Sequence, residues 1–272
     1  ETELITDAPS LPEPTTPRLG DGSGNVELLN VTFGYGDKPV LVDVTFHARP
    51  GTVTAIVGPS GSGKTTIARL ISRFWDVDSG AVMVDGVDIR ELGTEQLMSR
   101  LSMVFQDVYL FDDSLIANIR VGRPDASDEE VFRAADLSGV TSIANRLGWH
   151  TPVGEGGRLL SGGERQRVSV ARALLKQAPI VLFDEATSAL DAENEANILA
   201  AMDELREQST FIVIAHKLDT IKSADQIVVL DEHGQVSQLG THSELSDVPG
   251  IYRHFWQQRK AASGWKISSG RD

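Results

Sequence analysis

Cysteine is missing from all 272 residues, which excludes disulfides, thiolate metal ligands and cysteine nucleophiles. Long apolar runs are missing too: the longest are short, such as FIVIA at 211–215, far below the ~18 residues that a membrane-spanning helix needs. We therefore expect no part of this chain to cross a bilayer.

Basic residues are few, since 25 Lys and Arg stand against 39 Asp and Glu, giving a formal net charge of −14. That balance argues against a nucleic-acid partner, whose binding surface normally carries clustered Lys and Arg.

A hydrophobic content of 40% is enough to build a core. The length permits one large domain or two small ones. The chain begins at Glu1 without a methionine or a signal-peptide pattern, so we expect a piece cut from a longer protein, with processing of a small protein as the alternative.

The order of the apolar segments predicts an α/β fold. VELLNVTFGYG and VLVDVTFHA, from Val26 onward, are typical of two strands joined by a turn. TVTAIVG, PIVLFDE, TFIVIAH and QIVVLDE are short apolar runs separated by helical stretches, the pattern of buried strands in a parallel sheet. Residues 64–75 follow a helical period that places Ile67, Leu70, Ile71 and Phe74 on a core face.

Three segments differ from this α/β pattern. Residues 1–25 have the Pro, Gly, Ser and Thr content of a linker. Residues 107–172 have helical patterning without a comparable strand, which predicts a helical lobe inserted into the core. We expect the main domain to cover residues 26–260, and residues 261–272 to form a C-terminal tail.

GPSGSGKT at 58–65 fits the phosphate-binding pattern G-x-x-x-x-G-K-[ST], and it lies between a predicted strand and a predicted helix. The glycines let backbone N–H groups wrap closely around a polyphosphate. Lys64 can reach the β- and γ-phosphates, and the Thr65 hydroxyl can ligate Mg²⁺. The alternative is a Gly- and Ser-rich turn that matches by chance, and the strand before it and the helix after it argue against this alternative. With Thr66, the expected binding residues are Gly58, Pro59, Ser60, Gly61, Ser62, Gly63, Lys64, Thr65 and Thr66.

Other candidate residues follow the apolar runs. Asp184 ends IVLFD, where a carboxylate meets a metal at the C-terminal edge of the sheet, and Glu185 can orient or deprotonate an attacking water. The alternative is that both are solvated charges at the start of a loop. His216 closes TFIVIA and, taken alone, is more often a structural hydrogen bonder. Gln106 in MVFQD is, by itself, an ordinary loop amide.

LLSGGERQ at 159–166 predicts a second anion site. Ser161 and Glu164 form the S-x-x-E pattern of a capping box, so a well-capped helix is the simpler interpretation. That interpretation leaves Gly162 and Gly163 unexplained, since glycine costs helix stability. Close approach of a ligand to the backbone would explain them.

GPSGSGKT, LSGGERQ, IVLFDEA, SALD and the histidine of IAHKL occur in the order seen in the nucleotide-binding domain of ABC transporters, which residues 26–260 resemble. LSGGERQ before the IVLFDEA strand is the most specific of these motifs. The resemblance implies a P-loop NTPase core with a mostly parallel sheet, an N-terminal antiparallel β subdomain and an inserted helical subdomain. It also implies ATP hydrolysis with Mg²⁺.

In this family two such domains pair head to tail, with ATP between the P-loop of one and the LSGG of the other. Ser161, Gly162 and Gly163 would thus serve the nucleotide of a partner. The resemblance assigns adenine stacking to Tyr35, the catalytic carboxylate to Glu185 and the switch histidine to His216. It assigns the loop glutamine that joins the metal site to the membrane domain to Gln106, and the interface aspartate to Asp191. Glu164 replaces the glutamine of many relatives.

TPVGEGGRLLSGG and VYLFDDSLIANI resemble segments of exporter-type ABC proteins, in which Glu155 lies near the membrane domain. A transmembrane domain on the same full-length chain is implied, which would hold this domain at the cytoplasmic face of the cell membrane. The ending FWQQRKAASGW resembles actinobacterial iron–siderophore importers built on the exporter architecture. The alternatives are a soluble ABC ATPase acting on ribosomes or chromosomes and a regulatory subunit without turnover. One domain, no inserted coiled coil and the acidic balance disfavour the first, while Glu185 and His216 disfavour the second.

Overall fold

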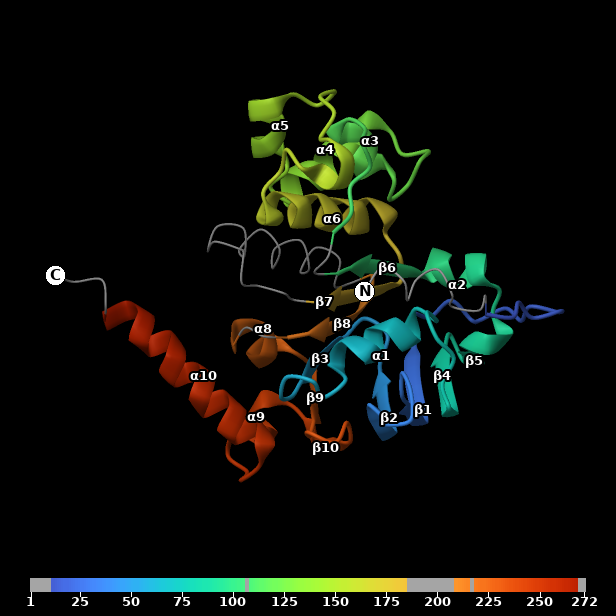
Figure 1. Cartoon of the computed structure of the whole chain (residues 1–272), viewed down its shortest axis with the longest axis vertical. Coiled ribbons are helices and arrows are strands. Elements are labelled where there is room, and N and C mark those ends of the chain that lie inside the picture. The colour runs from blue at the N-terminus through green and yellow to red at the C-terminus, as the bar shows by residue number, and fades with distance from the viewer. Residues whose placement is uncertain (1–10, 106–107, 185–207, 216–217, 269–272) are drawn as a thin grey trace.

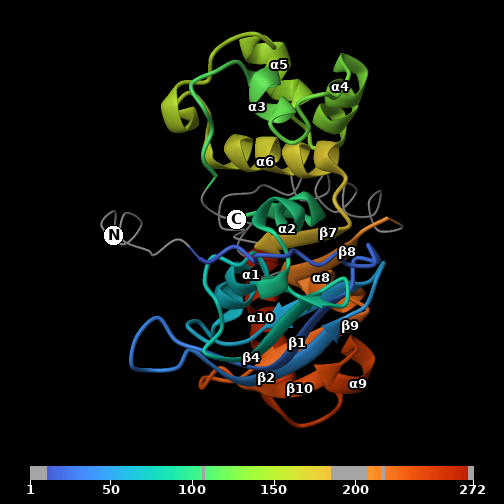
Figure 2. The same cartoon turned by 90° about the vertical axis from the view of Figure 1, so that its right-hand side faces the viewer.

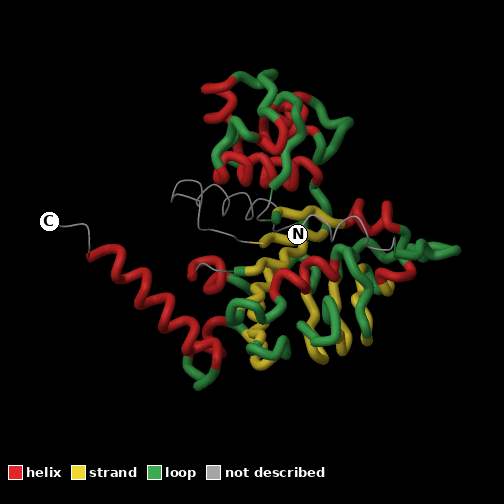
Figure 3. Tube along the Cα trace, viewed as in Figure 1, coloured by secondary structure: helices red, strands yellow, loops and turns green. Residues whose placement is uncertain are grey.

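The computed structural model describes residues 11–105, 108–184, 208–215 and 218–268, without the side chains of 261–268. It is an α/β structure, as the sequence predicts, with two sheets and a helical lobe (Figure 1). Strands occupy the lower half of the view and helices fill the lobe above them (Figure 3). None of the helices in the described ranges combines the length and the apolar character needed to cross a bilayer.

The larger sheet has six strands, and its inner strands are parallel. Among its described strands, only the edge pair of β10 with β9 is antiparallel. In spatial order its strands are β10 (Val236–Gly240), β9 (Gln226–Leu230), β3 (Val53–Val57), β8 (Thr210–Ile214), β7 (Ile180–Asp184) and β6 (Leu101–Val104). The four predicted buried strands are therefore confirmed as β3, β7, β8 and β9.

The smaller sheet is antiparallel and has four strands. In spatial order they are β2 (Leu41–Ala48), β1 (Val26–Phe33), β4 (Ser79–Val84) and β5 (Val87–Asp88). The predicted pairing of the first two strands is confirmed. The 3₁₀ turn η1 (Ile89–Glu91) and helix α2 (Thr94–Arg100) lead from this sheet back to β6.

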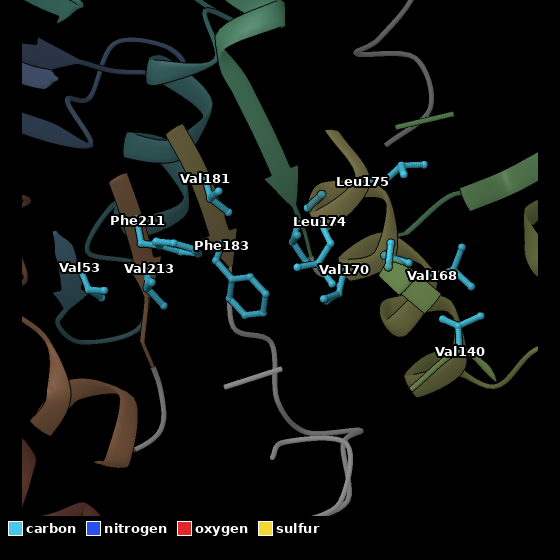
Figure 4. Packing of buried hydrophobic residues seen from close by; sticks show 14 of the residues in the cluster. Val53, Val140, Val168, Val170, Leu174, Leu175, Val181, Phe183, Phe211 and Val213 are labelled. Atoms are coloured by element: carbon cyan, nitrogen blue, oxygen red, sulfur yellow. The ribbon is translucent and has the colours of Figure 1, made fainter. Parts of the chain in front are cut away.

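The inner strands of the larger sheet are apolar on both faces because helices or the smaller sheet cover each face. On β7, Val181 and Phe183 pack with the helical lobe, whereas Ile180 and Leu182 pack with α1 (Lys64–Ile71) and the smaller sheet. Figure 4 shows the first group, with Val181 and Phe183 lying toward Val170 and Leu174 of α6 (Gly162–Lys176). Helices α1 and α6 thus lie on opposite faces of one sheet, as Figure 2 also shows.

The lobe is built around α6, which contacts α3, α4 and β6. Its other elements are α3 (Leu115–Arg120), α4 (Asp128–Leu137), α5 (Thr141–Leu147) and the 3₁₀ turn η2 (Glu155–Gly157). Helix α8 (Leu218–Ser223) connects β8 to β9, and α9 (His242–Ser246) and α10 (Ile251–Ser268) follow the last strand. The last helix extends away from the sheets in Figure 1.

Phe74 is not on a core face, so that part of the predicted helix 64–75 is wrong. Helix α1 ends at Ile71, and Arg73 adopts a left-handed φ of 52°. Because the helical period stops there, the side chain of Phe74 is 44% exposed and contacts the rings of Trp75 and Phe105.

The segment before β1 is hydrogen-bonded to the smaller-sheet side of the molecule. Arg18 N–H donates to the carbonyl of Glu91 (2.9 Å), and Gly24 N–H donates to the Asp85 carboxylate (2.7 Å). Arg73 donates to the carbonyl of Pro12 (2.9 Å). Residues 11–25, for which we predict linker composition, thus contact the domain at several points.

Candidate nucleotide site

The predicted phosphate loop, residues 58–66, connects the buried strand β3 to the N-terminus of α1. Gly63, the residue before α1, has φ 90°, and a Cβ there would lie 2.5 Å from Leu41 Cδ2. Gly61 has φ 82° and faces open space, so a ligand can approach its backbone. No described side chain caps α1. The N–H groups of its first turn are therefore available to an anion.

Lys64 lies at the start of α1 with its side chain largely buried. Its Nζ donates to the carbonyls of Pro59 (2.6 Å) and Gly58 (3.1 Å), within the loop. Burial lowers the pKa of Lys64, and Arg259 lowers it further, whereas the Asp184 carboxylate raises it. The ammonium group therefore lies inside the predicted phosphate loop and near the carboxylate that ends β7.

Thr65 and Asp184 meet, although they come from distant parts of the chain. The Thr65 hydroxyl donates to Asp184 Oδ2 (3.0 Å), and Asp184 is buried at the end of β7. A hydroxyl and a carboxylate are the hard oxygen donors that Mg²⁺ prefers, and Mg²⁺ takes one or two carboxylates together with substrate phosphates and water. The described ranges hold no cluster of three or more His, Cys, Asp or Glu that would suit a metal cage. This pair fits Mg²⁺ bound together with a nucleotide.

Tyr35 lies beside the phosphate loop with its side chain half exposed. Its hydroxyl and that of Thr66 are 3.3 Å apart. Its ring packs edge-on against Phe33 and Trp75, with centroids 5.0 and 5.1 Å away. These contacts fix the ring next to α1, and its 49% exposure leaves surface for stacking on a flat base.

The start of α6 is the predicted second anion site. Ser161 and Gly162 are exposed there, while Gly163 is buried. The capping box is present: Ser161 N–H donates to Glu164 Oε2 (2.7 Å), and Glu164 N–H donates to Ser161 Oγ (3.2 Å). Since α1 and α6 cover opposite faces of the larger sheet, the two predicted phosphate sites of one chain are not brought together.

Four predicted site residues, Gln106, Glu185, Asp191 and His216, lie outside the described residues. Strands β6, β7 and β8 end at Val104, Asp184 and Ile214, shortly before three of them. These strands are parallel neighbours. Their C-terminal ends meet at one edge of the sheet, where β3 also leads into the phosphate loop.

Sequence reasoning missed a hollow beside LLSGGERQ at 159–166, which we call the signature segment. A cavity of about 450 Å³ is lined by Val108, Tyr109, Glu155, Gly156, Arg158, Gly162 and Arg165. The nearby side chains of Tyr109 and Phe111 are more than half exposed. Two aromatic residues in the loop VYLF were the signal that could have pointed to this surface. Glu155, for which the exporter resemblance implies a place near the membrane domain, lies on this cavity.

The sequence profile of the ABC transporter family matches residues 41–188. The chain is 47% identical over 272 residues to the mycobactin import ATP-binding/permease protein IrtB of Mycolicibacterium thermoresistibile, covering 98% of this chain and 46% of that protein. It is 47% identical over 234 residues to the ATP-dependent lipid A-core flippase of Vibrio vulnificus, covering 85% of this chain and 40% of that one. The chain thus spans slightly less than half of these relatives.

Among solved structures, a bacterial Atm1-family ABC exporter with ATP bound superposes with a TM-score of 0.88 at 42% identity. The superposition covers 94% of this chain and 46% of that one. The two sheets and the helical lobe therefore match the corresponding part of a known ABC exporter structure.

Proposed function

The chain belongs to the ABC transporter family and is an ATP-binding ATPase domain; from this premise we propose how its residues divide the work of a transporter. Lys64 and the backbone of residues 58–66 bind the phosphates of ATP. Thr65 and Asp184 hold Mg²⁺, with Gln106 as a further ligand, and the ion offsets the charge of the phosphates when bound. Tyr35 stacks on the adenine.

Glu185, directly after the metal-binding Asp184, orients the attacking water and accepts its proton. His216 donates a hydrogen bond to the γ-phosphate, and Asp191 lies where two domains meet. The chemistry is in-line attack of water on the γ-phosphorus, releasing ADP and inorganic phosphate. The residues do this chiefly by positioning and by charge.

A second ATPase domain completes each site. The observation that carries this proposal is the placement of α1 and α6 on opposite faces of one sheet. A phosphate held at Lys64 is thereby kept from the Ser161 of the same chain. Ser161, Gly162 and Gly163 instead contact the γ-phosphate bound by the partner's Lys64, in a head-to-tail pair.

Pairing of complementary lesions tests this arrangement. Lys64→Ala disables the phosphate loop, and Ser161→Arg blocks the start of α6 with a bulky side chain. In a mixed dimer one site carries both lesions while the other joins an intact Lys64 to an intact Ser161, so ATPase activity should reappear on mixing. The measurement needs conditions in which dimers form, checked by light scattering. Dimers without any recovery would refute the shared site.

The ATPase domain drives a transmembrane domain that precedes it on the full-length chain, at the cytoplasmic face of the membrane. The exposed loop with Tyr109 and Phe111, together with the cavity beside Glu155, is the surface for that domain.

The transported substrate is an iron–siderophore complex. The similarity to the mycobactin importer supports this, because it runs through 98% of this chain, whereas an equal identity to the lipid A-core flippase spans 85%. Uptake of ⁵⁵Fe-siderophore by vesicles containing the full-length protein tests the substrate. ATP-dependent lipid A movement without iron uptake would reject it.

A further inference from the structure

Arg146 of α5 contacts the capping box at the start of α6. Its guanidinium Nη2 donates to Glu164 Oε1, while the other carboxylate oxygen accepts from Ser161 N–H. The Glu164 side chain is 16% exposed and that of Arg146 is 53% exposed. Both oxygens of one carboxylate are therefore engaged at the position where the signature segment becomes a helix.

Glu164 creates a conflict of charge at this position. A carboxylate in the first turn is stabilised by the positive end of the helix dipole. The same end is needed to attract the γ-phosphate of the partner's nucleotide, and a carboxylate nearby repels that phosphate. The cap that stabilises α6 thus works against its proposed ligand unless a cation offsets the charge.

Burial by itself raises the pKa of the Glu164 carboxyl, but hydrogen bonds from Ser161 and Arg146 outweigh it and hold the pKa below its usual range. The carboxylate therefore stays charged at neutral pH. Arg165, the neighbouring cation, donates to the carbonyl of Leu160 (2.7 Å). Arg146 is the cation that the structure pairs with Glu164.

We propose that Arg146 is a positioning residue for nucleotide binding in trans: by neutralising Glu164 it lets the start of α6 accept the partner's γ-phosphate. The inference rests on the proposed function, because the phosphate at α6 comes from a second copy. It assigns a role to a residue of α5 outside the motifs that bind ATP.

An arginine on a capping box also has a plain structural interpretation, and α4 supplies the matched control. There Ser127 and Glu130 form the same box, and Arg123 donates to Glu130 Oε1 as Arg146 does to Glu164. Glu130 is more exposed, at 47%. The α4 pair lies outside the signature segment, so it reports what such a pair contributes to stability alone.

The experiment measures ATPase rate against ATP concentration for Arg146→Gln, Glu164→Gln and the double variant. Arg146→Gln leaves a bare carboxylate and should raise the half-saturating ATP concentration about three- to tenfold, with the rate at saturation nearly unchanged. Glu164→Gln leaves the Arg146 guanidinium without its carboxylate partner and should lower the half-saturating ATP concentration about two- to threefold. The double variant should return to within about twofold of the unaltered chain.

Opposite shifts cannot come from lost stability, since each single variant removes the same ion pair. Arg123→Gln and Glu130→Gln should change the melting temperature without moving half-saturation. The inference would be overturned if Arg146→Gln and Glu164→Gln moved the half-saturating ATP concentration in the same direction. It would also be overturned if they left that concentration unchanged, as is expected of the α4 variants. A double variant that remains impaired would overturn the inference as well.

The mixing experiment on the same preparations separates the two proposals. Absence of recovery between Lys64→Ala and Ser161→Arg chains rejects the shared site itself. If ATPase activity recovers on mixing but Arg146→Gln and Glu164→Gln do not shift the half-saturating ATP concentration in opposite directions, only the role of Arg146 is rejected.

Discussion

Lys64 and Thr65 are neighbours in the chain, yet their side chains contact different parts of the site. Lys64 donates to carbonyls inside the phosphate loop, and Thr65 donates to Asp184 at the end of β7 in the larger sheet. A phosphate would give the ammonium a charged acceptor in place of neutral ones, which makes a stronger hydrogen bond. Local geometry thus prepares the pair for an anion on one side and a metal on the other.

Replacing Glu185 by glutamine should separate binding from chemistry. Glu185→Gln keeps the phosphate loop, so ATP binding should persist, whereas loss of a general base should slow hydrolysis by a factor on the order of 10²–10⁴. Filter binding of ATP and phosphate release measure the two effects. Glu27→Gln, on a strand of the smaller sheet, controls for the loss of a charge. Hydrolysis at the original rate would remove Glu185 from the mechanism.

Tyr35 should contribute by stacking, with little reading of the base edge. Tyr35→Ala should weaken ATP binding on the order of tenfold, since losing an aromatic surface under a base costs ~1–3 kcal/mol. Tyr35→Phe loses only the contact with Thr66 and should bind almost as well. Titration with a fluorescent ATP analogue measures both, and ATP and GTP should differ only modestly. Equal binding by the alanine variant would mean that Tyr35 is simply packed.

At the scale of elements, α6 joins three tasks in one helix. Its start carries the signature segment, and its apolar face packs against the sheet through residues such as Val170 and Leu174 (Figure 4). Arg172, farther along, donates to the carbonyls of Tyr109 and Asn118 (2.9 and 2.7 Å). A shift of α6 would therefore move both the signature segment and the loop that exposes Tyr109.

Asn118 should be essential to the shape of that loop. It is fully buried, and its amide donates to the carbonyls of Phe111, Asp113 and Ser114 while accepting from Phe111 N–H (2.9 Å). Asn118→Ala removes the partner of these part-buried backbone groups and should cost about 1–3 kcal/mol of unfolding free energy.

Urea unfolding of Asn118→Ala provides the measurement. Asn145→Ala, on the exposed side of α5, is the matched control and should change stability by less than about 0.5 kcal/mol. Equal unfolding midpoints for the two variants would show that the loop does not depend on Asn118.

At the scale of the molecule, one sheet separates two surfaces with different tasks. The smaller sheet and α1 cover one face, and the helical lobe covers the other. In the proposed head-to-tail pair, this layering would let the phosphate loop and the signature segment of one chain act on different nucleotides. It leaves the lobe on the side of the larger sheet opposite to α1.

The net charge of −14 predicts no nucleic-acid partner. In low salt the chain should not shift duplex DNA or structured RNA in a gel, because an acidic surface repels the phosphate backbone. Addition of ribosomes should leave ATP hydrolysis unchanged. Faster ATP hydrolysis on addition of ribosomes or DNA would favour the soluble ABC ATPase instead. A basic protein that binds nucleic acid serves as the positive control for the gel.

The sequence by itself determined the motifs and six of the strands, because those depend on local pattern; the strands are β1, β2, β3, β7, β8 and β9. Apolar runs such as TVTAIV and IVLFD can only be buried, and they became β3 and β7. The phosphate loop needs glycine at Gly61 and Gly63, and its spacing is visible in one dimension. Helix α1 was found for the same reason, but its end was not, since the left-handed turn at Arg73 has no marker such as glycine.

Only the tertiary structure decided which distant residues meet. The contact of Thr65 with Asp184 depends on the order of strands in the sheet, and that of Arg146 with Glu164 depends on how α5 packs beside α6. The placement of α1 and α6 on opposite faces likewise has no trace in local periodicity. Such contacts form because folding buries apolar faces as a whole, and the polar groups carried on those faces then lie where the packing leaves them.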